Sequence, residues 1–112
     1  MSFEPREYLR HILAEADYLA TASAGLTREA FQHDDTLQRA FVRSLGIVGE
    51  TAKKVPPEMR AQYPEVEWKA MAGLRDRLVH DYFGVDYDIV WDVIENKIPV
   101  LRSHVRRILD TA

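Results

Sequence analysis

Apolar residues recur at helical spacing along almost the whole chain, and this periodicity limits the possible folds more than any other feature. Few segments alternate as a β-strand would, and breakers such as Gly25, Pro56 and Gly84 fall between the amphipathic segments. This arrangement is typical of a helical bundle. With 112 residues the chain is long enough for one core and too short for two. The sequence therefore predicts a single all-α domain over residues 1–112, an up-down antiparallel bundle of four to five helices.

Breakers and capping residues place the expected helices. Four long helices are expected over about residues 5–24, 35–54, 65–82 and 86–108, with Asp34 or Asp35 capping the second and Asp86 or Asp88 capping the last. Short helical turns are expected after Thr27 and between Pro56 and Pro64. Pro99 lies well inside the last apolar pattern and predicts a kink or break there. Trp68 and Trp91 are expected to anchor the core.

Composition and charge narrow the function. The chain has no cysteine, which excludes disulfides and thiolate metal sites, and it has no apolar run of membrane-spanning length, so a cytoplasmic protein is expected. No spacing of its histidines suggests a ligand set, so neither metal nor cofactor is expected. The net charge of −3 argues against holding nucleic acid by bulk electrostatics. The local candidate for a basic surface is the group Lys97, Arg102, Arg106 and Arg107, which is more simply interpreted as a charged helix end.

The segment from Leu74 to Gly84 carries the residues best suited to phosphate chemistry. Arg75 can direct two donors at a phosphate, and His80 titrates near neutral pH and can take and return a proton. Asp76 precedes His80 by one helical turn and could orient its imidazole. Tyr82 adds a hydroxyl that could be modified. The sequence thus suggests acid–base chemistry at a phosphate, in which His80 serves as general base or acid while Arg75 stabilises charge on the phosphorane.

Helix geometry complicates this hypothesis. On an ideal helix Arg75 and His80 point about 140° apart, whereas Arg75 and Tyr82 return to nearly the same face. Either the helix loosens near Gly84, or a symmetry-related copy supplies the missing groups across a twofold interface, which we favour.

Simpler interpretations remain open. Arg75 with Asp76, or Arg77 with Asp81, could form surface ion pairs worth under about 1 kcal/mol each. Tyr82 could instead be a core aromatic that closes the helix end.

A second candidate segment lies on the second long helix. Glu50 follows two small residues, Gly46 and Gly49, which predict close packing of another helix and allow a carboxylate near an interface.

The ordered motifs resemble a known family. The pattern Arg75-x4-His80-x-Tyr82, with Asp76 directly after the arginine, resembles the signature of HepT-like toxins of the HEPN superfamily. Further stretches resemble that family's glycine-glutamate-alanine, tryptophan-to-arginine and aspartate-to-tryptophan segments; they are residues 46–53, 68–76 and 84–91. Together the matching parts cover roughly residues 37 to 101.

The resemblance implies a function and a set of roles. It implies a HEPN-like helical homodimer with a cleft at the interface, and a metal-independent ribonuclease, either an endoribonuclease or an RNA 3′-end nuclease. Such a protein is the toxin of a type VII-like toxin-antitoxin system, and a cognate MntA-type nucleotidyltransferase silences it by AMPylation. By the same resemblance, Arg75 and His80 are the catalytic pair supported by Asp76, Tyr82 accepts AMP, and Gly49 and Glu50 are possible interface or support residues.

Two alternatives to an enzyme stay open. One is a non-catalytic binding subunit that docks a nucleotidyltransferase and presents Tyr82 to it. The other is a purely structural helical dimer.

Overall fold

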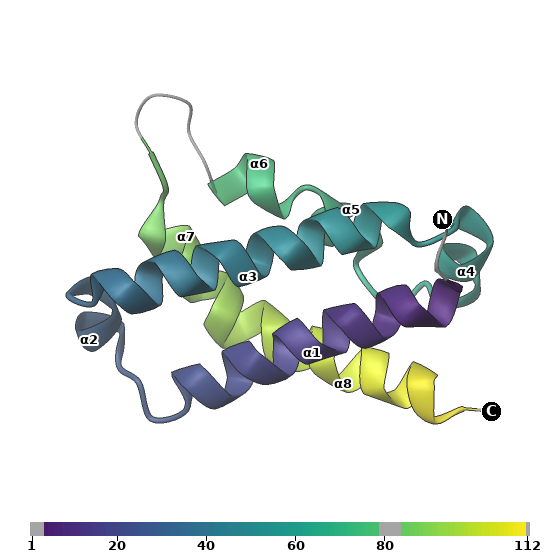
Figure 1. Cartoon of the computed structure of the whole chain (residues 1–112), viewed down its shortest axis with the longest axis horizontal. Helices are drawn as coiled ribbons and strands as arrows, with labels where there is room; N and C mark the ends of the chain where they lie inside the picture. The colour runs from purple at the N-terminus through teal and green to yellow at the C-terminus, as the bar shows by residue number, and fades with distance from the viewer. Residues whose placement is uncertain (1–3, 79–83, 112) are drawn as a thin grey trace.

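The molecule is a bundle in which successive helical runs alternate in direction. The computed structural model describes residues 4–78 and 84–111, and its elements are helices. The longer runs are α1 (Pro5–Ser23), α3 (Asp35–Lys54), the pair α5 (Trp68–Ala72) and α6 (Leu74–Leu78), and α8 (Ile98–Asp110). Figure 1 shows α3 running antiparallel to α1, α5 and α6 returning along α3, and α8 running back beside α1. The predicted all-α antiparallel bundle is confirmed.

Shorter helices connect or extend these runs. They are α2 (Arg28–Gln32), α4 (Pro57–Gln62), α7 (Tyr87–Asp92) and the π-helical turn η2 (Val93–Lys97). Local side chains explain where two helices begin, because Thr27 accepts the N–H of Ala30 at 3.1 Å and Asp34 accepts that of Leu37 at 3.0 Å. Each bond satisfies a backbone donor that the first turn leaves without an internal partner. The turn expected after Thr27 and the cap at Asp34 are both confirmed.

Helix α3 lies at the centre of the core and contacts α1, α2, α5, α6 and α7. Its Phe41 is fully buried and stacks on Phe31 with the ring centroids 5.4 Å apart. Trp91 lies against Phe31 at the same centroid distance, and Trp68 donates its indole N–H to the carbonyl of Tyr63 at 2.9 Å. Both tryptophans are buried, which confirms them as core anchors.

The single helix expected over residues 65–82 is wrong for its described part. The helical run begins only at Trp68 and is interrupted at Gly73, where φ is −89° and ψ is 4°. Glycine is the weakest helix former after proline, because it loses the most backbone freedom. The N–H of Gly73 still bonds to the carbonyl of Lys69 at 3.1 Å, and that of Arg77 bonds to the carbonyl of Gly73 at 3.1 Å. These bonds connect α5 to α6 across the interruption.

The break expected near Pro99 is confirmed. Pro99 lies in the first turn of α8, directly after the wider turn η2. Proline has no N–H to bond to the carbonyl four residues earlier, and its ring clashes with that carbonyl. A π-helical turn in front of Pro99 accommodates both effects. None of the helices in the described ranges is long and apolar enough to span a bilayer.

Candidate nucleic-acid site

Arg75 lies on α6, which packs against α3. Its neighbour Leu74 is buried and holds one side of α6 against the core. Arg75 and Asp76 lie on the other side of the helix and are both exposed. Arg75 lines a groove of about 720 Å³, whose walls come from α3, α6 and the start of α7. The other lining residues are Arg39, Val42, Arg43, Gly46, Ile47, Glu50, Thr51, Lys54, Val85 and Tyr87.

A glycine sets the distance between α3 and the α5–α6 run. A Cβ atom on Gly49 would lie 3.1 Å from the carbonyl oxygen of Met71 and 3.7 Å from the Cβ of Leu74. No side chain fits there without displacing backbone, so Gly49 has the predicted close-packing role. A Cβ atom on Gly46, by contrast, would meet nothing within 4 Å, so no described helix of the same chain packs closely there.

Glu50, which directly follows Gly49 on α3, also lines the groove. Its carboxylate is 3.4 Å from the ammonium of Lys53, one turn further along α3. The structure therefore brings Arg75 and Glu50 to one groove.

The groove is strongly basic. Four cations line it, Arg39, Arg43, Lys54 and Arg75, against the single carboxylate of Glu50. Among the described residues none of these four cations forms an ion pair. A chain of net charge −3 thus concentrates free positive charge in one place.

An aromatic ring also lines the groove. Tyr87, the first residue of α7, is half-buried, and its ring packs edge-on to Phe31 with the centroids 6.3 Å apart. Asp86 begins α7 by accepting the N–H groups of Asp88 at 3.0 Å and Ile89 at 3.2 Å. These contacts hold the Tyr87 ring in a defined position.

Helix α2 is joined to α7 by two side-chain hydrogen bonds. Asp88 of α7 accepts hydrogen bonds from the Arg28 guanidinium at 2.8 Å and from the Gln32 amide at 3.2 Å. The hydrogen bond and charge of Arg28 hold the pKa of Asp88 below its usual 3.8.

The remaining predicted site residues lie outside the described part of the chain. They are His80 and Tyr82, together with Asp81 of the alternative ion pair. The two described residues Leu78 and Asp86, on either side of this segment, are joined by a backbone hydrogen bond of 2.9 Å. The described residues on the two sides of this segment are therefore held together, next to Arg75 on α6 and Val85 in the groove.

The C-terminal cations do not extend this groove. Arg102 and Arg106 both pair with Asp17 of α1, at 2.5 and 3.0 Å, and Lys97 lies 3.7 Å from Glu67. Figure 1 shows α8 on the opposite side of α3 from α6. Within one chain, these cations therefore lie apart from the groove that contains Arg75.

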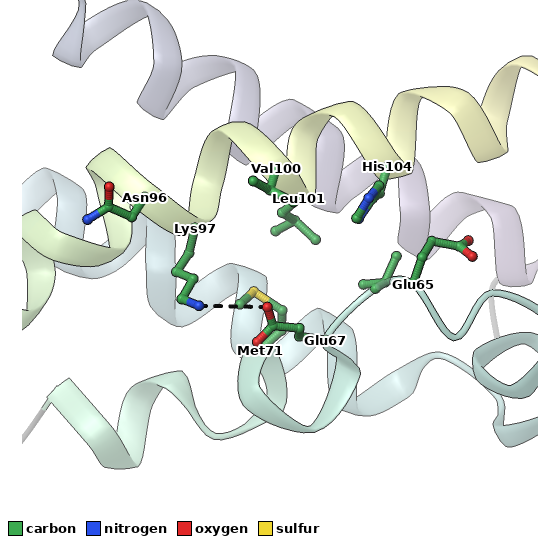
Figure 2. A pocket seen from close by; sticks show the side chains of 9 residues that line it. Glu65, Glu67, Met71, Asn96, Lys97, Val100, Leu101 and His104 are labelled. Atoms are coloured by element: carbon green, nitrogen blue, oxygen red, sulfur yellow. Dashed lines mark ion pairs between the residues drawn. The ribbon is translucent and has the colours of Figure 1, made fainter.

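A second, smaller cavity lies between the start of α5 and α8 (Figure 2). It has a volume of about 100 Å³, and the ion pair of Lys97 and Glu67 spans it. His104 also lines it, but no predicted site residue does. The described side chains contain no group of three or more histidines and carboxylates suited to a metal ion.

Sequence reasoning missed most of the groove. Arg39 and Arg43 are one turn apart on α3, and Lys54 returns to the same face about three turns after Arg43. That spacing was a usable signal for a basic stripe. Tyr87 carried no comparable signal, because its place in the groove depends on the packing of α7 beside α3.

Comparisons with known proteins agree with this picture. Residues 9–108 match the model of the family described as "Ribonuclease HepT-like". A protein of Caldanaerobacter subterraneus named "Putative RNase TTE0752" is 49% identical over 105 residues, which cover 94% of each chain. A protein of Thermococcus cleftensis named "Probable ribonuclease HepT" is 32% identical over 103 residues, covering 92% of this chain and 94% of the relative. No solved structure matches the chain significantly. The resemblance seen in the sequence motifs is confirmed, and the chain belongs to the ribonuclease HepT-like family.

Proposed function

We propose that this chain is a metal-independent ribonuclease that cleaves RNA with Arg75 and His80. The main support for this proposal is that Arg75 is exposed on the wall of a basic groove, in a chain that belongs to a ribonuclease family. A guanidinium in that position is available to a phosphate, because no described carboxylate occupies it.

The chemistry needs only side chains. His80 removes the proton of the RNA 2′-hydroxyl, whose oxygen attacks the adjacent phosphorus and releases the 5′-oxygen of the next nucleotide. The proton is returned to that leaving oxygen, and the product strand ends in a cyclic phosphate. Arg75 stabilises the added negative charge of the phosphorane, and Asp76 orients the imidazole. Each group is expected to contribute about 10² to 10⁴ in rate.

On an ideal helix, side chains five residues apart such as Arg75 and His80 point about 140° away from each other, which favours a site completed by a second copy. We propose that the working form is a homodimer in which the groups of two copies complete each site. Gly49 and Glu50 then have a supporting role, Gly49 by setting the position of α6 and Glu50 from the groove wall.

The decisive experiment is cleavage of total cellular RNA by the purified chain in the presence of a chelator. Wild type should degrade discrete RNA species, whereas Arg75→Ala and His80→Ala should lose at least about 10²-fold in rate. Arg77→Ala, which changes another exposed cation of α6, is the matched control and should remain active. Retained cleavage by His80→Ala in a nuclease-free preparation would refute the assignment of the base.

We further propose that this ribonuclease is the toxin of a cytoplasmic type VII-like toxin-antitoxin system, silenced by AMP on Tyr82. An MntA-type nucleotidyltransferase would transfer AMP from ATP to the phenol oxygen and release pyrophosphate. The attached group blocks the cleft by its bulk, and its phosphate engages Arg75.

Tyr82→Phe tests this switch. The variant should cleave RNA like wild type and stay active after treatment with the nucleotidyltransferase and ATP, while wild type gains the mass of AMP and loses activity. Full inactivation of the Phe variant would show that the partner acts by binding alone. If unmodified wild type cleaves no RNA, the non-catalytic docking subunit becomes the better function.

A further inference from the structure

The groove beside Arg75 continues as a basic stripe along one face of α3. Arg39, Arg43 and Lys54 are exposed on this face, at spacings of four and eleven residues that return to the same side of a helix. From the first to the last the stripe is about 22 Å long, at 1.5 Å per residue. Phe41 and Leu45, on the opposite face of α3, are fully buried. Their burial fixes the orientation of the helix and keeps the basic stripe on the surface.

The stripe differs from the other cationic surface in being unpaired. On α8, Arg102 and Arg106 share the carboxylate of Asp17, whereas Arg39 and Arg43 pair with no described carboxylate. A guanidinium that is not already paired can neutralise a phosphate and release its condensed counterions. The α3 stripe is therefore suited to a polyanion, and the α8 surface is not.

The aromatic ring in the same groove indicates which kind of polyanion this surface would bind. Tyr87 is half-buried, lines the same groove, and is held edge-on by Phe31. Unpaired cations along a groove, together with a positioned aromatic ring, are the features by which proteins hold single-stranded nucleic acid. A duplex keeps its bases stacked inside and could not use the ring.

We propose that Arg39, Arg43 and Lys54 hold the backbone of a single-stranded RNA along α3, and that Tyr87 stacks on one of its bases beside Arg75. This inference rests on the proposed ribonuclease function and assigns the substrate path to that enzyme. Arg39, Arg43, Lys54 and Tyr87 are then positioning residues for RNA, distinct from Arg75, which acts on the phosphate.

The test measures binding apart from cleavage. The probe is a fluorescein-labelled single-stranded RNA of about 12 nucleotides with 2′-O-methyl groups, which lacks the nucleophile and stays intact. Fluorescence anisotropy across a range of KCl concentrations gives the affinity and its salt dependence. Arg39→Ala/Arg43→Ala should weaken binding at least about tenfold and reduce the slope of log affinity against log salt by about 1.4.

Matched variants separate the stripe from bulk charge. Lys69→Ala/Arg107→Ala removes two exposed cations of α5 and α8 outside the groove and should leave binding within about twofold of wild type. Tyr87→Leu should weaken binding about tenfold without changing the salt slope, whereas Tyr87→Phe should keep the affinity. Thermal melts confirm that each variant is folded.

The outcomes distinguish the stripe from the catalytic proposal. Equal losses in both double variants, or equal affinity for a duplex probe, would overturn the single-strand path. Unchanged RNA affinity with loss of dimer would also overturn it, by making this face a protein interface.

If wild type cleaves RNA, the stripe variants should raise KM with kcat retained, whereas Arg75→Ala lowers kcat. If wild type binds through the stripe but never cleaves, the catalytic proposal fails and the RNA path stands.

Discussion

At residue 49 the absence of a side chain decides how closely the α5–α6 run approaches α3. A Cβ atom on Gly49 would lie too close to the carbonyl oxygen of Met71, at 3.1 Å, and in van der Waals contact with the Cβ of Leu74, at 3.7 Å. Leu74 directly precedes Arg75, so this contact also sets where the candidate catalytic arginine stands. Gly46, three residues earlier on the same helix, meets nothing within 4 Å.

Gly49→Ala and Gly46→Ala should therefore change stability in opposite directions. Gly49→Ala forces backbone apart and should lower the free energy of unfolding by about 1–3 kcal/mol. Gly46→Ala adds a methyl group in open space and should raise it by about 0.5–1 kcal/mol through helix propensity. Urea unfolding followed by circular dichroism measures both. Equal stabilisation by the two substitutions would show that α6 is not held by the contact at Gly49.

At the scale of elements, α7 is positioned by polar contacts from α2 as well as by its own cap. The Arg28 hydrogen bond keeps the pKa of Asp88 below 3.8, so the folded protein favours the ionised carboxylate. A lowered pKa contributes stability above the unfolded value and loses it as pH falls through the folded value. The α2–α7 contact should therefore weaken only in acid, below about pH 4.

Asp88→Asn should reduce the acid sensitivity of the fold. Wild type should lose stability between pH 4 and lower values more steeply than the variant, because the variant has no carboxylate to protonate at this position. Unfolding by urea at several pH values measures the difference. Asp110→Asn, an exposed carboxylate at the end of α8, is the control and should follow wild type. Parallel pH profiles for Asp88→Asn and wild type would contradict the prediction.

At the scale of the whole molecule, the acidic chain presents one basic groove, and the proposed active site depends on a second copy. A site built from two protomers has a distinctive signature, because two different defects can complement each other.

Mixing Arg75→Ala with His80→Ala should restore activity that neither variant has alone. After subunit exchange, half the dimers contain both variants, and each of these has one intact shared site, so about a quarter of wild-type activity is expected. The cleavage assay with total RNA measures the recovery, and light scattering verifies exchange into dimers. No recovery in verified mixed dimers would place Arg75 and His80 of one protomer in the same site.

Local sequence determined most of the elements. Thr27, Asp34 and Asp86 cap helices where their short polar side chains predict, Pro99 interrupts the last helix, and Trp68 is buried as expected. These outcomes depend on interactions within a few residues or on hydrophobicity, so a single sequence carries them. The family could also be identified from its ordered motifs alone.

Only the tertiary structure decided which charged residues share a groove. The pairing of Arg102 with Asp17 and the placement of Arg39 and Arg75 in one groove both depend on which helices pack together. Charges far apart in sequence have no local pattern that distinguishes a paired cation from a free one. The helices and the core were therefore readable from the sequence, whereas the basic groove came from the fold, because long-range packing brings its walls together.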